Sequence, residues 1–545
     1  MNEFKEIANL IEKTIKKNNL DIPISVKFSN FSDYFDVQIN DLVKLINNSN
    51  FSNIVKDLNK AMSETILVED FEILDSGFVN IRLSNEFLKI SLNNQINSFQ
   101  EKSKEINETV LFDYGGANIG KSLHVGHIRT LNIGRSLNNI YKIAGYKTIS
   151  DIHFGDWGMP IALILTYIEE NNLNIDDITH EDLENIYPSA SNISNTDKNF
   201  YSKAMKVSKE LNNQDENKIS QWKKIYEIST KNIKSLLNKL GFEFDYYLGE
   251  SDVIKLIPDY IEVLKKNKLV RYDQGALISN DNQDPPALIT KSDGSYMYLT
   301  TDIGTIINRE EAFDCDKYIY VVDQRQKNHF EQLFKLVKYF KLSNSEFLHV
   351  GFGTVNDLNG KPLKTRDGEN YKLLDLYSDI KNKLASINSE EKTVDILAKS
   401  VLSYSDLVTK RTSNYIFDLE KFTNVSGKSA IFIQYSQVRA KKLIMQNRNN
   451  LKCKEVTNDE RPLIIELLKY YHYFNVSLRS NEPHHIAEYA YELCQEFNRF
   501  YSKEKIISDK LDKSTQSHKL FIVNVFHKTI LEVFKCLGIE PVDEM

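Results

Sequence analysis

TVLFDYGGANIGKSLHVGHIRTLNIGRSLNNIYKIAGYKTISD, at residues 109–151, is the stretch of sequence that decides the fold. Its apolar run at 110–112 predicts a buried strand over residues 109–114, followed by a turn at two glycines. A helix then continues through Lys142, and residues 147–153 predict a second strand. A strand, a helix and a strand within about 45 residues form a βαβ unit, which is typical of a parallel sheet that binds its ligand at the carboxyl ends of the strands.

Within this stretch, KSLHVGH at residues 121–127 holds two of the 11 histidines in the chain. In the first turn of a helix, His124 and His127 would project on one face, because residues i and i+3 are neighbours. The helix N-terminus attracts phosphate, Gly126 lets a flat ring or a phosphate approach the backbone, and Lys121 adds a positive charge. This group suits the charge that develops on a phosphoryl group. A surface helix with incidental histidines is the alternative, since H-x-x-H alone is a weak pattern.

The composition is that of an ordinary globular protein, with 545 residues of which 41% are apolar and 27% charged. We find no apolar run of the roughly 18 residues that a membrane span requires, and the first helix lacks the apolar centre of a signal peptide. Four cysteines lie far apart without C-x-x-C spacing, which argues against a zinc site or a disulfide framework and fits a reducing cytoplasm. A net charge of −7 argues only weakly against a nucleic-acid partner, because phosphate binding requires a local basic face.

The pattern along the chain divides it into three expected domains. Residues 1–105 predict a small α/β domain, with a helix at 4–17 and a strand at 77–83. Residues 106–388 predict an α/β domain with the parallel sheet and a helical insertion at about 165–290, and residues 389–545 predict an all-α domain. Further strands of the parallel sheet are expected at 277–278, 296–299, 318–322 and 347–350, and the helices of the last domain at 391–410, 426–448, 460–480, 484–503 and 515–537.

The segment FDYGGANIGKSLHVGHIRT at 112–130 resembles the ATP-binding signature of class I aminoacyl-tRNA synthetases, and more narrowly its form in arginyl-tRNA synthetases. The resemblance implies a Rossmann-like parallel-sheet catalytic domain with a HIGH-type signature, a small N-terminal α/β domain and an all-α C-terminal anticodon-binding domain. Other segments similar to the family's occur in the same order over most of the chain: HFGDWG (153–158), GESDV (249–253), SYMYLTTDIG (295–304), YVVDQRQKNHF (320–330), GKPLKTRDGENYKLLDL (360–376) and QYSQVRAKKL (434–443).

The resemblance implies a two-step reaction. The carboxylate of L-arginine attacks the α-phosphate of ATP to give arginyl-adenylate and pyrophosphate, and the 2′-hydroxyl of the terminal adenosine of tRNA(Arg) then takes the arginyl group. The implied cofactors are ATP and Mg²⁺ bound with the nucleotide, with no dedicated metal site on the protein. The implied enzyme is a cytoplasmic monomer with no membrane partner.

The second signature departs from the broader class, whose Lys-Met-Ser-Lys-Ser loop closes on the triphosphate. Here the loop is KPLKTR at 361–366, without a Met-Ser pair, and Lys121 resembles the lysine that compensates in arginyl enzymes. A solvated turn is the alternative for this loop. The resemblance implies catalytic roles for His124, His127, Lys121, Lys364 and Arg366, and ATP contacts for Gly126, Gly155, Asp156 and Lys361.

Selection of arginine requires carboxylates that face a planar guanidinium. The resemblance assigns this role to Tyr298 and Asp302, with Asp113 and Glu250 as further candidates. An ordinary helix N-cap is the alternative for Asp302. The same resemblance places the α-carboxylate of the substrate at Asn118 and its α-amino group at Gln326.

The last domain carries a basic stripe with an aromatic side chain, a combination that suits single-stranded anticodon bases. Any one of these charges is also consistent with a solvated helix face. The residues expected to contact tRNA are Tyr435, Gln437, Arg439 and Lys442.

Two other classes of protein compete with this interpretation. Another class I synthetase, or a smaller nucleotidylyltransferase, shares the H-x-G-H element, but the nucleotidylyltransferase would not need the long helical domain. A non-catalytic synthetase-like tRNA-binding protein is the second alternative, against which the intact signature residues argue.

Overall fold

The computed structural model describes residues 4–29, 34–99, 101, 103–281, 285–292, 294–364, 371–386, 388–446 and 451–545. Its contacts divide the chain into two compact units. The central unit comprises Ser103–Thr423 and Leu537–Ile539, and the terminal unit comprises Met1–Lys102, Asn424–Cys536 and Glu540–Met545. Both ends of the chain therefore belong to the same unit.

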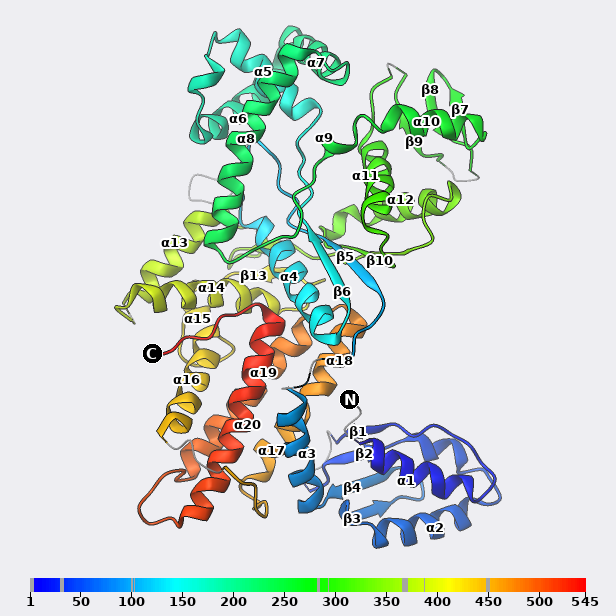
Figure 1. The fold of residues 1–545 in the computed structure, drawn as a ribbon, viewed down its shortest axis with the longest axis vertical. Helices are drawn as coiled ribbons and strands as arrows, with labels where there is room; N and C mark the ends of the chain where they lie inside the picture. The colour runs from blue at the N-terminus through cyan, green and yellow to red at the C-terminus, as the bar shows by residue number, and fades with distance from the viewer. Residues whose placement is uncertain are drawn as a thin grey trace. The chain divides into compact units, whose positions relative to one another are not determined.

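The central unit is built on a four-stranded parallel sheet (Figure 1). The apolar run at 110–112 is fully buried, as expected for a parallel strand with both faces covered. Helix α4 (Gly126–Ala144) connects the first two strands, so the predicted βαβ unit is confirmed. The strands lie in the order β11 (Glu346–His349), β10 (Lys317–Tyr320), β5 (Thr109–Asp113), β6 (Lys147–Asp151).

The order of the strands reverses between β5 and β10. From β5 the chain crosses through α4 to β6 on one side, and from β10 it crosses through α12 (Lys327–Tyr339) to β11 on the other. The loops that leave β5 and β10 at their carboxyl ends therefore diverge at this point, which is where open α/β sheets bind ligands.

Helices occupy much of residues 159–266, the first part of the predicted helical insertion, whereas residues 270–290 form a small separate sheet. Strands β7 (Val270–Asp273), β8 (Ala276–Ser279) and β9 (Leu288–Thr290) pair antiparallel with one another, so the prediction that 277–278 belongs to the parallel sheet is wrong. The predicted strand at 296–299 is also wrong, because helix α11 (Tyr298–Phe313) begins there. The insertion contains α5 (Met159–Glu170), the short η2 (Ile175–Asp177), α6 (His180–Thr196), α7 (Lys198–Asn212), α8 (Glu216–Lys239), α9 (Glu250–Val253) and α10 (Ile257–Lys266).

The remaining elements of the central unit follow β11. Helices α14 and α15 belong to this unit, so the contacts divide the chain between residues 423 and 424 and not near residue 389. Arg129 of α4 helps to hold α14, because its Nε donates to Asp406 at 2.8 Å and both side chains are buried. These elements are β12 (Val355–Asn356), α13 (Leu373–Leu384), α14 (Glu391–Leu407), β13 (Tyr415–Ile416) and α15 (Leu419–Phe422).

The terminal unit combines an antiparallel sheet from the start of the chain with helices from its end. Both the small α/β domain and the late helices were predicted from the sequence. The sheet has the order β1 (Val26–Phe28), β2 (Val37–Ile39), β4 (Val79–Leu83), β3 (Val68–Ile73), with α1 (Lys5–Lys16), η1 (Asp41–Leu45), α2 (Phe51–Glu64) and α3 (Asn85–Ser98). The late helices are α16 (Ala430–Gln446), α17 (Arg461–Leu468), α18 (Tyr470–Ser480), α19 (His484–Lys503) and α20 (Lys513–Leu537).

Buried polar contacts join the early and late parts of this unit. The amide of Gln95 donates to the carbonyl of Leu467 at 2.9 Å, and the guanidinium of Arg461 forms an ion pair with Asp36. Among the described residues, no helix is both long enough and apolar enough to cross a membrane.

Candidate active site at the sheet edge

The two signature histidines lie at the start of α4, in the loop that leaves β5. Helix α4 begins at Gly126, so His127 is in its first turn, whereas His124 precedes the helix, contrary to the prediction. The two rings still face each other, with centroids 4.1 Å apart. A Cβ at Gly126 would lie 2.8 Å from Cε1 of His124, so the glycine makes room for this ring.

Both imidazoles are held in the uncharged state. The amide of Gly126 donates to Nδ1 of His124 at 3.0 Å, which leaves the proton of the neutral ring on Nε2. The amide of His124 in turn lies 3.1 Å from Nδ1 of His127. Burial, aided by the charge of Lys121, lowers the pKa of His124, and burial lowers the pKa of His127 to about 3. Near neutral pH the pair can therefore donate hydrogen bonds to a phosphate without carrying charge.

Residues 371–373, which follow the second signature in the sequence, lie beside His124. The amide of Val125 donates to the carbonyl of Tyr371 at 2.8 Å, and the amide of Leu373 donates to the carbonyl of Leu123 at 2.9 Å. His124 itself forms an antiparallel bridge with Lys372. The backbone thus joins the first signature to residues 371–373, which follow the second signature in the sequence.

The start of the second loop is fixed at the other end by β12. The amide of Leu363 donates to the carbonyl of Val355 at 3.0 Å. Lys361 and Lys364 are exposed, while the predicted contact Arg366 lies outside the described residues. Lys121, the predicted compensating lysine, is half-buried, with its Nζ 4.0 Å from the ring centroid of Tyr187 of α6.

The residues of the HFGDWG turn contact the first signature and the GES turn more than they offer contacts to a ligand. Gly155 accepts a bond from the amide of Ile119 at 3.2 Å, and a Cβ at Gly155 would lie 2.1 Å from Oδ1 of Asn118. The predicted ATP contact Asp156 is fully buried, and its carboxylate accepts bonds from the amide and hydroxyl of Ser251 at 2.9 and 2.6 Å. Asp156 therefore fixes the GES turn and is not available to ATP.

An ion-pair network fills the carboxyl ends of β5 and β6. Nη2 of Arg309 lies 2.7 Å from Oδ2 of Asp113 and 2.6 Å from Oδ2 of Asp151. The side chains of Arg309 and Asp151 are completely buried. The prediction that Asp113 binds the substrate guanidinium is contradicted, because the carboxylate already pairs with an internal guanidinium. Arg309 was missed, since no local pattern in the sequence marks it.

An acidic side chain lies close enough to Asp302 to interact with its charge. Asp302 itself lies inside α11, whose N-cap is Met297, so the helix-cap alternative is wrong. Burial, together with the charges of Asp156 and Asp302, raises the pKa of Glu250 to about 8. Tyr298 is exposed one helical turn before Asp302. Sequence reasoning missed His329, whose Nε2 lies 2.6 Å from Oδ2 of Asp302 although it belongs to the YVVDQRQKNHF segment.

The candidate contacts for the amino-acid backbone flank the reversal between β5 and β10. Asn118 is exposed on the loop that leaves β5, and Gln326 is exposed in η3 (Gln324–Gln326), which follows β10. These side chains therefore come from the two loops that diverge at the carboxyl edge of the sheet.

Comparison with known proteins accounts for this arrangement. Residues 89–419 match the family described as tRNA synthetases class I (R), catalytic domain, and residues 433–545 match the DALR anticodon binding domain. The arginine–tRNA ligase of Alkaliphilus oremlandii is 32% identical over 532 residues, which are 90% of this chain and 90% of that protein. The chain belongs to the arginyl-tRNA synthetase family.

Other relatives carry the same name. The arginine–tRNA ligase of Francisella tularensis subsp. holarctica is 34% identical over 465 residues, which are 79% of this synthetase and 80% of the relative. Crystal structures of the arginyl-tRNA synthetases of Plasmodium falciparum and Thermus thermophilus match 99% of the chain with a TM-score of 0.80 each. At 24% and 18% identity, these two structures support the fold.

The DALR domain of the synthetase carries the residues expected to contact tRNA. The guanidinium of Arg439 lies 4.5 Å from the ring centroid of Tyr435 and 4.4 Å from that of Tyr501, and both rings are partly exposed. Lys442 is exposed as well. The prediction for Gln437 is contradicted, because this side chain is buried and its Nε2 lies 3.3 Å from Nε2 of His527. Tyr501 was missed, since it lies on another helix.

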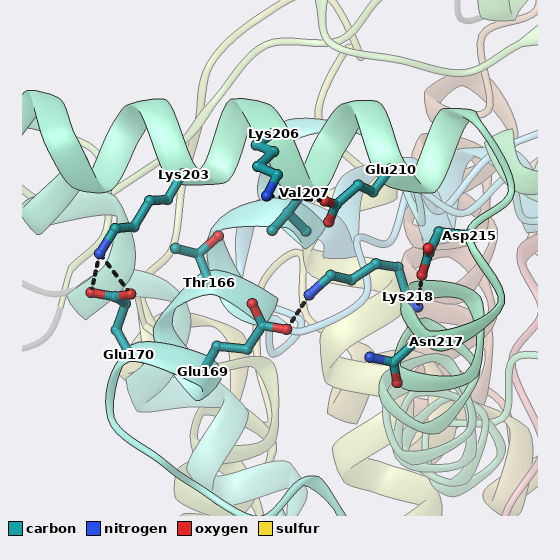
Figure 2. Close-up of a pocket in the computed structure, with 10 residues that line it drawn as sticks. All are labelled: Thr166, Glu169, Glu170, Lys203, Lys206, Val207, Glu210, Asp215, Asn217 and Lys218. Carbon is teal, nitrogen blue, oxygen red and sulfur yellow. Dashed lines mark hydrogen bonds and ion pairs between the residues drawn. The ribbon is translucent and has the colours of Figure 1, made fainter.

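The synthetase has a further pocket, of about 500 Å³, on the insertion helices (Figure 2). Figure 2 shows Lys203 and Lys218 pointing to Glu170 and Glu169 of α5, with which they form ion pairs. Because these cations are already paired with acids of the same pocket, the pocket offers no net positive site for phosphate. Its lining residues are Thr166, Glu169, Glu170, Lys203, Lys206, Val207, Glu210, Asp215, Asn217 and Lys218.

Proposed function

We propose that this synthetase attaches L-arginine to tRNA(Arg) in two steps at the carboxyl edge of β5 and β10. A carboxylate oxygen of arginine bonds to the α-phosphorus of ATP, and the bond to the bridging oxygen breaks to release pyrophosphate. The terminal adenosine hydroxyl of the tRNA then bonds to the arginyl carbonyl carbon, and AMP leaves. The single observation that carries the proposal is the backbone pairing of residues 123–125 with 371–373, which holds the segment after the second signature against the first.

In this proposal the first signature donates neutral hydrogen bonds and the lysines supply charge. Nε2–H of His124 would donate to a phosphate oxygen, and His127 packs against it. Lys121, Lys361, Lys364 and Arg366 would offset the negative charge of the triphosphate, which needs positioned cations more than covalent chemistry. Imidazoles and lysines are poor ligands for Mg²⁺, so the ion would arrive bound to the nucleotide.

The arginine side chain would be recognised by Asp302, Glu250 and Tyr298. The guanidinium is planar and pairs with carboxylates through parallel hydrogen bonds, so its charge and shape both match this group. Asn118 would hold the α-carboxylate of arginine, and Gln326 its α-amino group. Asp113 is left out, because it pairs with Arg309.

The DALR domain would bind the anticodon of tRNA(Arg) through Tyr435, Arg439 and Lys442. Aromatic rings and a guanidinium can stack on unpaired bases, and the lysine can contact a phosphate. The proposal also includes a monomer in the cytoplasm, which the resemblance to the family implies.

The test is ATP–pyrophosphate exchange with each amino acid, with and without tRNA, followed by aminoacylation. We expect exchange that depends on arginine and transfer of arginine to tRNA(Arg). Exchange with a different amino acid would show another class I synthetase. Retained tRNA binding without exchange under either condition would show a non-catalytic tRNA-binding protein.

A further inference from the structure

Asp302, the central acid of the proposed guanidinium site, has a histidine partner. Nε2 of His329, on α12, lies 2.6 Å from Oδ2 of Asp302, on α11. Both side chains are about one-third exposed, at 31%. The hydrogen bonds of the described residues leave Oδ1 of Asp302 without a protein partner, so this oxygen can accept a bond from a ligand while Oδ2 stays bonded to the ring.

We infer that His329 is a positioning residue that aims Asp302 at the substrate and, when protonated, competes with the guanidinium of arginine for the same negative charge. The inference rests on the proposed function. A neutral His329 donates Nε2–H to Oδ2 and leaves the pair with one net negative charge for the guanidinium. A protonated His329 forms an ion pair with Asp302, and the pair then has no net charge.

Arginine affinity should therefore rise with pH. The hydrogen bond to Asp302 raises the pKa of His329 above its usual 6.5. Below this pKa the ring is charged and opposes the guanidinium, and above it the ring is neutral and arginine binds to the full charge of Asp302. By linkage, bound arginine also makes His329 easier to deprotonate.

Among the described residues, another group near Asp302 titrates in the same range. Glu250 of α9 has a pKa of about 8, and its ionisation also makes the site more negative as pH rises. Burial raises the pKa of the tyrosines whose charge would interact with Asp302, so they stay neutral up to at least pH 9; these are Tyr260 of α10, Tyr298 of α11 and Tyr320 of β10. Burial also raises the pKa of Tyr296, which lies near Tyr260. On α12 itself, Lys327 and Glu331 form an ion pair 3.7 Å apart, so their charges offset each other.

The size of the effect follows from the distance between like charges. Two cations that share one carboxylate lie several ångströms apart in a partly solvated site, where such a repulsion corresponds to roughly a 10- to 100-fold change in affinity. We therefore expect the Michaelis constant for arginine to be at least about 10-fold higher at pH 6 than at pH 9.

The experiment measures arginine-dependent ATP–pyrophosphate exchange, in the presence of tRNA, from pH 6 to pH 9. Wild type is compared with His329→Gln, whose amide can donate to Asp302 but does not titrate, and with His329→Ala. All three, and the control variant His349→Gln, are repeated with Glu250→Gln to remove the second titration. His349→Gln is the matched control, because His349 stacks on the neighbouring Phe330, with ring centroids 5.3 Å apart, and does not bond to Asp302.

In the Glu250→Gln background, the enzyme with native His329 should have a Michaelis constant for arginine that depends on pH, and so should the His349→Gln control. The His329→Gln variant should have a low Michaelis constant that does not depend on pH. His329→Ala should give a flat value that is raised at every pH, with little change in kcat. A His329→Gln enzyme that retains the wild-type slope, or a wild-type enzyme without a slope, would overturn the role of His329 while leaving the arginine activity in place. Absence of arginine-dependent exchange in wild type at every pH would instead remove the proposed function, and this inference with it.

Discussion

At the scale of single residues, the candidate active site has neutral hydrogen-bond donors in its histidines and positive charges in its lysines. Backbone amides and burial keep the signature imidazoles neutral, so they can donate hydrogen bonds that do not depend on pH near neutrality. In the proposed function, the positive charge would come from Lys121 and from the lysines of the second loop. Phosphate would then be bound by neutral donors at the sheet edge and by cations on segments around it.

Replacing His124 by alanine should lower the rate of adenylate formation more than it weakens arginine binding. Its Nε2–H would contact phosphate charge that grows in the transition state, and loss of one such donor costs about 2–4 kcal/mol. Rapid-quench measurement of adenylate at saturating arginine gives the rate directly. An unchanged rate would remove His124 from the chemistry.

The signature histidines should also not cause the rate of adenylate formation to fall as the pH is lowered slightly below neutrality. The pKa of His127 is lowered to about 3, so the ring is neutral at pH 7 and protonates only far below it. At saturating arginine, the adenylation rate should therefore not fall between pH 7 and pH 6 because of this residue. A wild-type acid limb that disappears in His127→Gln would contradict this assignment.

Replacing Asp302 by asparagine should raise the Michaelis constant for arginine at least about 30-fold, since loss of one partner of a buried charge pair costs about 2–5 kcal/mol. The constant for ATP should change little. Discrimination against citrulline, which is neutral and nearly isosteric with arginine, should shrink. Steady-state aminoacylation with both amino acids measures these effects.

Asp113→Asn is the matched control for this change. Because Asp113 pairs with the buried Arg309, its loss should mainly lower stability, seen as a lower urea midpoint. Asp113→Asn could instead raise the Michaelis constant for arginine as much as Asp302→Asn does and leave the urea midpoint unchanged. Asp113 would then bind the substrate, and its ion pair with Arg309 would not be its main role.

At the scale of helices and strands, the sequence predicted the elements with strong periodicity. The predictions failed where contacts with other parts of the fold determine the structure. The buried run at 110–112 and the helix after His127 have clear patterns, and both were found. The short apolar run at 277–278 predicts a strand but cannot say which sheet it joins. In the site, residues of recognisable motifs were predicted, whereas Arg309 and His329 act through tertiary contacts that no local spacing reveals.

Helix α4 supplies the clearest test at this scale. Arg129 donates to Asp406, to the carbonyl of Gly353 at 2.9 Å and to that of Ser413 at 2.7 Å. Arg129→Met leaves Asp406 as a buried unpaired charge, which should cost about 3–5 kcal/mol. Hydrogen exchange should become faster in α4 and α14, with a lower urea midpoint.

A double variant separates the charge from the packing. Arg129→Met with Asp406→Leu removes both charges, and replacing a buried pair by apolar residues is often close to neutral. We expect it to recover most of the lost stability. A double variant as unstable as Arg129→Met would show that the bonds to the two carbonyls, and not the ion pair, hold α4.

At the scale of the whole molecule, tRNA binding has to work against a net charge of −7. In the proposed function, the group of Tyr435, Arg439 and Tyr501 would be one local tRNA contact, because it combines a cation with two partly exposed rings. Bases can be held by stacking and by edge contacts without a strongly basic surface.

Arg439→Gln should weaken tRNA(Arg) binding by about 1–3 kcal/mol, the usual value for one stacked base. Filter binding at several salt concentrations measures the loss, and Arg479→Gln, the same charge change at an exposed site in the same unit, should have a smaller effect. Equal losses in the two variants would mean that net charge, and not this group, determines affinity.

The division of the chain also sets an order of events during translation. Asp36 and Gln95 leave the ribosome early, but their partners Arg461 and Leu467 are made only after residues 103–423 of the central unit. The partners are 372 and 425 residues apart in the sequence. At about 5–20 residues per second, their synthesis is therefore separated by roughly 20 to 80 seconds. During that time the first domain exposes a carboxylate and an amide that will later be buried, while the whole central unit can complete its sheet. The first domain therefore completes its contacts with the late helices only after residues 103–423 have been synthesised.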